Sequence, residues 1–536
     1  MLSSFVVSSP RDDVLANQDL LDIIFEFVHG GTNTVSPSPS QGVGSNQQLL
    51  HIALTHTGFR DPAFKVLWKE IPTLLPLLKL LPGFSLVEGI YIFTHIPSTE
   101  AELGRFCRYA KHVERVKFSQ QEEVVSPFAY QALATIVLLD PGFRLPALRT
   151  IRIECNPRHD YAGASFLLTT PSASLSRLEV VGVTPESAIF IRQAASIIAL
   201  RQLGLRELHL EGRMDEQVLV DIFGELSGLK TLSHVDIDVL SPDGSCSFKR
   251  PILPTLSRLP SMTHLSLHVG CRGDHFEWWQ ICNHEATFPS LRVLHLTLRG
   301  ARDAVIHAFR AISAHNLLHA KITLDFSQRT NTPGNVLRSH FFNLMDAFSQ
   351  VETVEIIHFD GSSKLPSAFR SYFNSAADHP NLVSLALPPL EAFGGEDLSC
   401  LELLAKGCPK LLIARIPLPL PRIFPELFHY LATVSISSSH PLRSLEFSTP
   451  WMEPLAKLGV KEYIIIAQYI HRLFPNLDRL GVYRDDQGRV HGCEKAIGAL
   501  WDLIVALKEA KEEGAASVRR CDSCTEAIQP LKGGSD

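Results

Sequence analysis

The pattern L-x-x-L-x-L recurs along most of this chain and constrains its fold more than any other feature. The clear copies are PALRTIRI (146–153), ASLSRLEV (173–180), GLRELHL (204–210), SMTHLSL (261–267), PSLRVLHL (289–296), PNLVSLAL (380–387), PLRSLEF (441–447) and PNLDRLGV (475–482). Weaker copies begin at Val113, Leu232 and Val351, and degenerate copies lie near residue 319 and at Leu411. Successive copies start 27 to 35 residues apart, so most of the 536 residues follow one period of about 30.

Each copy alternates like a short β-strand, and several copies are followed by segments in which apolar residues recur at helical spacing. The expected helices are 188–200, 216–226, 304–312, 336–348, 368–376 and 463–474. The period predicts an α/β fold in which residues 83–510 form a curved leucine-rich-repeat solenoid of about 13 degenerate repeats. The alternative is an ordinary sheet of βα units, which normally carries a Gly-rich phosphate turn that this chain lacks.

The first 82 residues lie outside this period. Residues 1–14 are expected to be flexible, and helical spacing then appears in LLDIIFEFV (20–28), QQLLHIALTHTGF (47–59) and DPAFKVLWKEI (61–71). Residues 30–46 are rich in Gly, Ser and Pro, which predicts a flexible insertion between the first two helices. Three short helices with this much apolar surface are too small to close a core alone and are expected to recruit a partner helix.

Residues 15–82 resemble the F-box, most closely the version found in large fungal families of F-box and leucine-rich-repeat proteins. The matching segments are NQDLLDIIFEFV, LLHIALTHTGFRDPAFKVLWKEI and LLPLLKLLPG (74–83). There are two departures: Asn17-Gln18-Asp19 replaces the Leu-Pro that begins many F-boxes, and the insertion lengthens the first loop. The repeats complete the same architecture, so the resemblance spans nearly the whole chain.

The resemblance implies a noncatalytic adaptor. In this family the F-box docks on the Skp-family linker subunit of an SCF-type cullin–RING ubiquitin ligase, while the repeats hold a protein substrate. The docking residues it implies here are Leu20, Leu21, Ile24, Phe25, Leu49, Leu50, Leu54, Phe59, Pro62, Ala63, Leu67 and Trp68. The alternative is that some of them, Leu67 and Trp68 in particular, pack against the first repeat instead.

The face of the sheet opposite the inward leucines is the candidate substrate surface, because side chains alternate along a strand. This concave face begins with basic residues, Arg115, Lys117 and Arg152, and continues with acids and histidines. We hypothesise that a basic or histidine-sensitive substrate segment binds Glu207, His209, Glu211, His234, Asp236, Asp238, His264 and His295. The alternative is a solvated face. Histidines on separate strands offer no preset metal geometry, so no metal is expected there.

The motifs of common enzyme active sites are missing from the sequence. The chain has no P-loop, G-x-G-x-x-G turn, G-x-S-x-G elbow or H-E-x-x-H helix, so no catalytic residue and no cofactor is predicted. Cys521 and Cys524 form a single C-x-x-C pair, for which zinc would need two further ligands. This pair lies in residues 511–536, which are expected to be a flexible tail carrying ordinary surface thiols.

Charge and cysteine content narrow the partners and the compartment. Fifty basic and 56 acidic residues give a net charge of −6, which argues against a dedicated binder of nucleic acid or anionic membranes. The ten cysteines lack framework spacing, no segment is apolar enough to span a membrane, and residues 1–13 do not resemble a secretory signal. The expected location is the cytoplasm, the nucleus or both.

Two classes of function therefore stay open from the sequence. The first is the substrate receptor of a ubiquitin ligase. The second is a repeat scaffold that does not promote ubiquitination, whether or not it pairs with the linker subunit. An enzyme with widely dispersed catalytic residues is a third interpretation.

Overall fold

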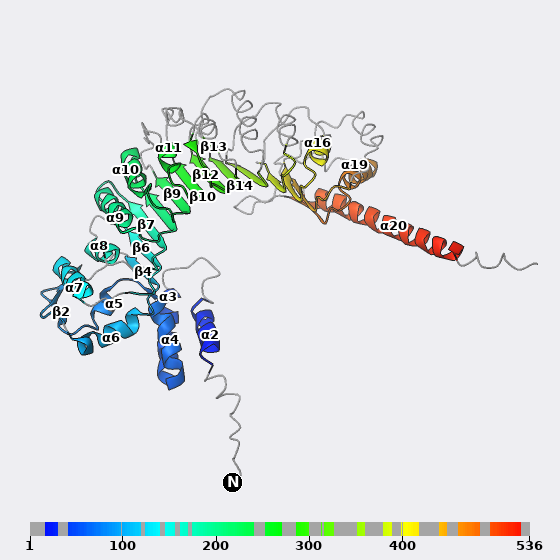
Figure 1. Cartoon of the computed structure of the whole chain (residues 1–536). Helices are drawn as coiled ribbons and strands as arrows, with labels where there is room; N and C mark the ends of the chain where they lie inside the picture. The colour runs from blue at the N-terminus through cyan, green and yellow to red at the C-terminus, as the bar shows by residue number, and fades with distance from the viewer. Residues whose placement is uncertain are drawn as a thin grey trace, which may run out of the picture. The chain divides into compact units, whose positions relative to one another are not determined.

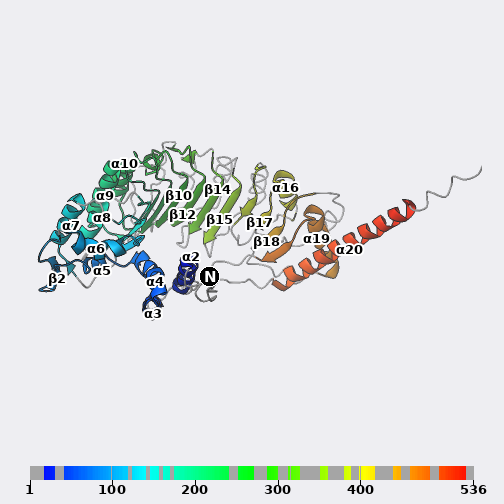
Figure 2. The same cartoon turned by 60° about the horizontal axis from the view of Figure 1, so that its bottom comes forward.

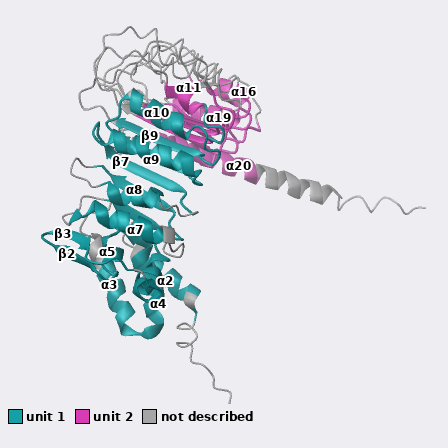
Figure 3. Cartoon of the chain, turned by 60° about the vertical axis from the view of Figure 1, so that its left-hand side comes forward, with its two compact units in different colours: residues 1–242, 258–262 teal, residues 243–257, 263–536 magenta. Residues whose placement is uncertain are grey.

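The computed structural model describes residues 17–30, 41–97, 99–118, 124–139, 145–155, 161–169, 174–240, 252–270, 286–299, 312–313, 316–325, 351–359, 379–387, 398, 400–416, 439–447, 459–482 and 494–526. The chain divides into two compact units (Figure 3). The first comprises Met1–Pro242 with Arg258–Met262, and the second comprises Asp243–Ser257 with Thr263–Asp536.

The described part of the first unit, from residue 17 on, starts with three helices and continues with alternating strands and helices. Its helices are α2 (Gln18–Gly30), α3 (Gln41–Thr55), α4 (Thr57–Lys69), α5 (Leu75–Leu78), α6 (Glu100–Ala110), α7 (Pro127–Leu139), α8 (Ala162–Thr169), α9 (Ala188–Arg201) and α10 (Glu216–Leu226). Its strands are β1 (Glu70–Ile71), β2 (Phe84–Val87), β3 (Ile90–Phe93), β4 (Arg115–Phe118), β5 (Val124–Val125), β6 (Thr150–Glu154), β7 (Arg177–Val183), β8 (Glu207–Gly212) and β9 (His234–Leu240).

The main sheet of this unit is parallel, in the order β1-β4-β6-β7-β8-β9. The first residues of successive strands pair directly, as Arg177 does with Glu207 and Glu207 with His234. Helices α8, α9 and α10 stack in chain order on one face of this sheet (Figure 1), so its other face is left to polar side chains. Strands β2, β3 and β5 form a separate small sheet.

The second unit repeats the same arrangement. Its strands are β10 (His264–Gly270), β11 (Ala286–Thr287), β12 (Val293–Arg299), β13 (Ile312–Ser313), β14 (His319–Asp325), β15 (Thr353–Phe359), β16 (Ser384–Ala386), β17 (Ile413–Ile416), β18 (Ser444–Phe447) and β19 (Arg479–Val482). Its described helices are α11 (Ile252–Leu256), α16 (Cys400–Gly407), α19 (Val460–Leu473) and α20 (Glu494–Glu526). The parallel order is β10-β12-β14-β15-β16-β17-β18-β19 (Figure 2), and β11 pairs with β13.

Strands β6 to β9, β12 and β14 to β19 each begin with the same hydrogen-bonded link to the repeat before them. The carbonyl of Arg149 accepts from the N–H groups of both Ser176 and Arg177, at 2.9 Å each. The carbonyl of Arg443 does the same for Asp478 at 2.7 Å and Arg479 at 2.9 Å. Because one acceptor fixes two consecutive donors, this link sets the register of each new parallel strand on the last.

The repeated apolar positions form the core. The first apolar residue of each of the thirteen repeats is no more than 1% exposed: Val113, Leu148, Leu175, Leu205, Leu232, Met262, Leu291, Leu317, Val351, Leu382, Leu411, Leu442 and Leu477. In every repeat the strand starts two residues after this position. The predicted α/β class is thus confirmed, with six parallel strands in the main sheet of the first unit and eight in that of the second.

Several predicted boundaries change. The degenerate repeat placed near residue 319 has its first apolar residue at Leu317, and β1 joins the sheet directly after the third helix although no strand was predicted there. Helix α9 matches the prediction 188–200, and α10 and α19 match 216–226 and 463–474. The predictions at 304–311, 336–348 and 368–376 lie outside the described residues, and Ile312 belongs to β13.

Two segments predicted to be flexible are helical in part. Helix α3 begins at Gln41, inside the predicted insertion 30–46, although Gly42 and Gly44 are poor helix formers. Helix α20 runs to Glu526, through most of the predicted tail 511–536. It begins by packing against α19 and β19, and helix formation then propagates cheaply from that anchored start.

Helix α20 covers the last strand of the second unit. The Lys508 ammonium donates to the carbonyl of Leu477 and lies 4.0 Å from the Asp478 carboxylate. A terminal repeat has no further neighbour to bury its apolar surface, so a covering helix replaces that neighbour. None of the helices in the described residues is long and apolar enough to cross a membrane.

Candidate interaction surfaces

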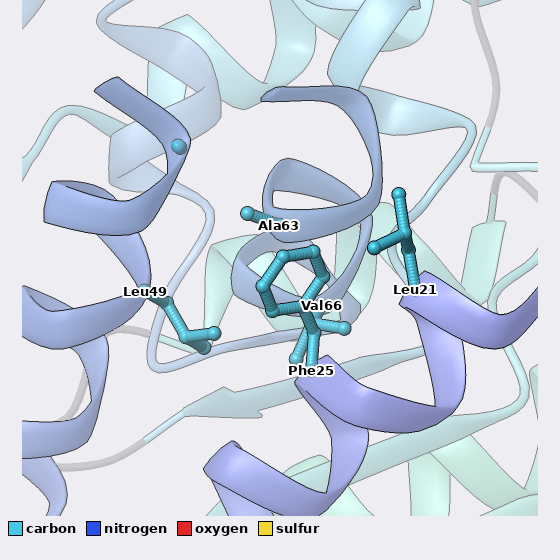
Figure 4. Close-up of a cluster of buried hydrophobic side chains, with 6 residues drawn as sticks. Leu21, Phe25, Leu49, Ala63 and Val66 are labelled. Atoms are coloured by element: carbon cyan, nitrogen blue, oxygen red, sulfur yellow. The ribbon is translucent and has the colours of Figure 1, made fainter. Parts of the chain in front are cut away.

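The three N-terminal helices share a small core (Figure 4). Leu21 and Phe25 of α2 pack with Leu49 of α3 and with Ala63 and Val66 of α4, and each of these side chains is less than 5% exposed. The Phe25 ring meets Phe59 edge-on, with centroids 5.8 Å apart. Contrary to expectation, three short helices do enclose apolar side chains of their own.

Two ion pairs fix α2 on α4. Lys65 donates to Asp22, and Lys69 donates to Glu26 at 2.5 Å. The hydrogen bond to Asp22 raises the pKa of Lys65, and the hydrogen bond from Lys69 lowers the pKa of Glu26. The four side chains are between 24% and 55% exposed. Exposed ion pairs add little stability, so these two pairs orient α2 more than they stabilise it.

Beside this core, α2 keeps a stripe of apolar side chains in solvent. Leu20 is 37% exposed, Ile24 40%, Ile23 64% and Phe27 77%. These four residues are spaced three and four apart, so they share one face of the helix. Helix α3 has a shorter equivalent in Leu50 and Leu54, which are 43% and 73% exposed.

The structure divides the predicted docking residues into three groups. Exposed are Leu20, Ile24, Leu50 and Leu54; partly buried are Phe59, Leu67 and Trp68; buried inside the three-helix unit are Leu21, Phe25, Leu49, Pro62 and Ala63. The last group cannot offer its side chains to a partner without opening the core. Sequence reasoning treated the broad apolar face of α2 as one surface, whereas half of it packs internally. It also missed Ile23 and Phe27, which the same helical spacing includes.

Trp68 packs within the first unit. Its ring stacks on Tyr109 of α6 with centroids 4.9 Å apart, and Phe64 meets the same tyrosine edge-on at 5.8 Å. This contact joins the third helix to the elements that follow it. Tyr109 precedes the first repeat, which starts at Val113, so this is not the packing against the first repeat that the alternative interpretation described.

The polar face of the first unit carries a ladder of ion pairs that crosses its strands. Arg115 pairs with Glu70 at 3.1 Å, and Lys117 and Arg152 share Glu154 at 3.3 and 3.4 Å. Arg152 and Arg177 share Glu179 at 3.1 and 2.6 Å, and Arg177 also reaches Glu207 at 2.8 Å. The sequence indicated a basic start to this face, but its four bases pair with four acids on the same or adjacent strands.

Within β8 and between β8 and β9, the described ion pairs of this ladder involve a histidine in place of lysine or arginine. There His209 Nδ1 lies 2.8 Å from Asp236 Oδ2, and His209 Nε2 lies 3.6 Å from Glu211 Oε2. The hydrogen bond with Asp236 is the main reason that the pKa of His209 is raised above its ordinary 6.5, and burial opposes the rise. These two strands carry acidic side chains but no lysine or arginine.

Six of the predicted substrate-binding residues lie on these strands, Glu207, His209 and Glu211 on β8 and His234, Asp236 and Asp238 on β9. Strand pairing brings them together on one face of the first unit. His264 and His295 lie on β10 and β12 in the second unit, where His264 pairs with Val293 and His295 pairs with Ser266 and Lys321.

The described residues contain no group of three or more His, Cys, Asp or Glu side chains arranged to hold a metal ion. The side chains of Cys521 and Cys524 lie outside the described part of the structure.

Comparison with known proteins adds little. No protein-family model matches the chain. No curated protein matches it. Among solved structures, the chain is similar to the crystal structure of a Bacteroides fragilis protein, with 15% identity and a TM-score of 0.31, over 51% of this chain and 76% of that chain. A likeness of this degree defines neither fold family nor function.

Proposed function

We propose that this chain is a noncatalytic F-box and leucine-rich-repeat adaptor that recruits a protein substrate to an SCF-type cullin–RING ubiquitin ligase. Helices α2 and α3 dock the Skp-family linker subunit, and the polar face of the repeats binds the substrate. The observation that carries the proposal is the exposed apolar stripe on α2, Leu20, Ile23, Ile24 and Phe27, beside a core that is already closed.

The stripe supports docking on energetic grounds. Burying a large apolar side chain gains roughly 1.5–3 kcal/mol relative to leaving it exposed. Four such residues on α2, with Leu50 and Leu54 on α3, offer enough surface for a partner helix to lie against. The two ion pairs to α4 hold α2 in one orientation, which reduces the entropy lost on binding.

The charge of the polar face supports a basic substrate segment. From β1 to β8 the bases of this face are engaged by acids of the same ladder. On β8 and β9 the strands carry four acids, and the carboxylates of Glu211 and Asp236 lie 3.6 and 2.8 Å from the two ring nitrogens of His209. Opposite charge on the partner favours both encounter and specificity at such a surface.

The docking proposal is tested by copurification of the full chain with the linker subunit. Wild type is expected to capture the subunit, and the double variant Leu20→Asp with Ile24→Asp is expected to lose it. Ile189→Asp is the matched control, because Ile189 is 65% exposed on α9 of the same unit, outside the three helices. A wild-type chain that captures no linker subunit refutes the adaptor and favours the non-ubiquitinating scaffold.

The substrate surface is tested by proximity labelling in cells with the proteasome inhibited. Proteins enriched by wild type and lost in the double variant with reversed charge at Asp236 and Asp238 are the expected substrates. Retention of the whole labelled set after charge reversal would exclude this face as the substrate surface, while leaving the docking result unaffected.

A further inference from the structure

His209 lies at the centre of the polar face of the first unit. On β7 its direct neighbour is Glu179, with Arg177 beside it; on β9 its direct neighbour is Asp236, flanked by His234 and Asp238; on its own strand Glu207 and Glu211 lie two residues away on the same face. The imidazole is therefore surrounded by carboxylates on three strands.

These carboxylates are not equivalent. Glu179 is held by Arg152 and Arg177, and Glu207 is held by Arg177. The two that face the imidazole nitrogens are Asp236, 2.8 Å from Nδ1, and Glu211, 3.6 Å from Nε2. Each ring nitrogen thus faces a different acid: Nδ1 faces Asp236 on the neighbouring strand, and Nε2 faces Glu211 on the strand of His209 itself.

Only a protonated imidazole donates to both acids at once. The imidazolium carries an N–H on each ring nitrogen, whereas the neutral ring carries one N–H and one lone pair. When Nδ1–H donates to Asp236 in the neutral form, the lone pair on Nε2 faces the Glu211 carboxylate and repels it. Glu211 is about one third exposed, so its side chain is able to turn away into solvent.

We propose that His209 is a pH-sensitive switch on the polar face: its protonated ring holds both Asp236 and Glu211, and loss of the proton releases Glu211. The raised pKa of His209 supports this, since the transition then lies above 6.5. Its effect on a partner rests on the proposed function: released Glu211 adds a carboxylate for a lysine or arginine of the substrate segment.

The switch is tested by NMR titration of the full chain carrying ¹³C in its histidine rings, with His209→Gln used to assign the signal. The wild-type midpoint is expected above 6.5. Asp236→Asn is expected to move it down clearly, because that acid makes the closest contact, and Glu211→Gln is expected to move it down less. His319→Gln, on β14 of the second unit, is the control and leaves the His209 midpoint unchanged. A wild-type midpoint at or below 6.5, or one that neither acid variant moves, overturns the proposal.

A second measurement addresses the release of Glu211. Binding of an oligolysine peptide is expected to strengthen as the pH rises through the His209 midpoint, with a smaller gain in Glu211→Gln. An equal gain in both proteins would show that Glu211 is not what the switch releases. Neither measurement uses the linker subunit, so failure of the switch and failure of the adaptor proposal give different results.

Discussion

Arg177 of β7 donates from Nη1 to Glu207 of β8 at 2.8 Å while its Nε donates to Glu179 on its own strand at 2.6 Å. One guanidinium therefore ties two strands and also neutralises a carboxylate that is only 10% exposed. Arginine suits this position because its donors lie in a fixed plane and address two acceptors at once.

Replacing Arg177 with Met should destabilise the first unit. The variant keeps most of the apolar stem but leaves the buried Glu179 with Arg152 as its remaining ion-pair partner in the ladder. We expect the free energy of unfolding to fall by about 1–3 kcal/mol, the usual penalty for a buried polar group that loses a partner.

Urea unfolding followed by circular dichroism measures this loss. Glu207→Gln is the matched control, because Glu207 is 43% exposed and its ion pair should contribute about 0–1 kcal/mol. Equal effects of the two variants would mean that the ladder acts as a set of surface pairs and that the burial of Glu179 has no energetic consequence.

Gly212 at the end of β8 should not tolerate a side chain. Its φ is +142°, and a Cβ there would lie 2.2 Å from the backbone nitrogen of Val183. Gly212→Ala should therefore force the backbones of β7 and β8 apart and lower the unfolding free energy by more than the ~1 kcal/mol that glycine-to-alanine changes gain at compatible sites.

Gly224 in α10 gives the opposite case. A Cβ at Gly224 meets nothing within 4 Å, and alanine is favoured over glycine in a helix by about 1 kcal/mol. Thermal unfolding of both variants should show opposite shifts. A stabilised Gly212→Ala protein would contradict the described pairing of β7 with β8.

The placement of the strands was the part of the fold that the sequence determined best. A leucine period of about 30 residues fixes where each strand starts, because only a stacked neighbour can bury the first apolar residue, as at Leu205 and Leu442. Strand β1 was missed because Glu70 and Ile71 continue a helical pattern. Its pairing with Arg115 and Val116 comes from tertiary contact, which a local pattern does not carry.

The surfaces were predicted less completely than the fold. Helical spacing identified the apolar residues of α2, but which of them are buried depends on where α4 packs: Leu21 faces it and Leu20 does not. The alternation of side chains along each strand predicted correctly which residues lie on the polar face. The net charge of that face was misjudged, because acids such as Glu70 beside Arg115 and Glu207 beside Arg177 are brought to their partners by the pairing of strands that are distant in the sequence.

His440 should make the stability of the second unit depend on pH. The ring is buried; Nε2 lies 2.8 Å from the carbonyl of Cys408, and Nδ1 accepts from the N–H of Leu442 at 3.2 Å. Burial lowers the pKa of His440 below 6.5, so the unfolded chain takes up the proton more readily than the folded one. Acidification through 6.5 therefore reduces the free energy of unfolding, and the full stability is present above that pH.

Unfolding measured between pH 5 and 8 in wild type and in His440→Gln isolates this contribution. The glutamine variant should be less stable at pH 8, by about 1–2 kcal/mol for the disturbed hydrogen bonds. The difference from wild type should shrink as the pH falls below 6.5, since only the wild type loses the His440 contribution. A difference in unfolding free energy that does not change with pH would mean that folding does not favour the neutral form of the His440 ring.

Helix α2 should show opposite consequences at neighbouring positions. Phe25 is 3% exposed in the three-helix core, and Phe25→Ala should lower the stability of that core by about 3–5 kcal/mol. Ile24 is 40% exposed, and Ile24→Ala should change stability by only about 0.5 kcal/mol. Hydrogen exchange of α2 to α4 measures the first effect, and linker-subunit affinity measures the second. A change at Ile24 that weakens linker binding without increasing exchange would separate docking from folding; increased exchange in both variants would mean that the exposed stripe also supports the core.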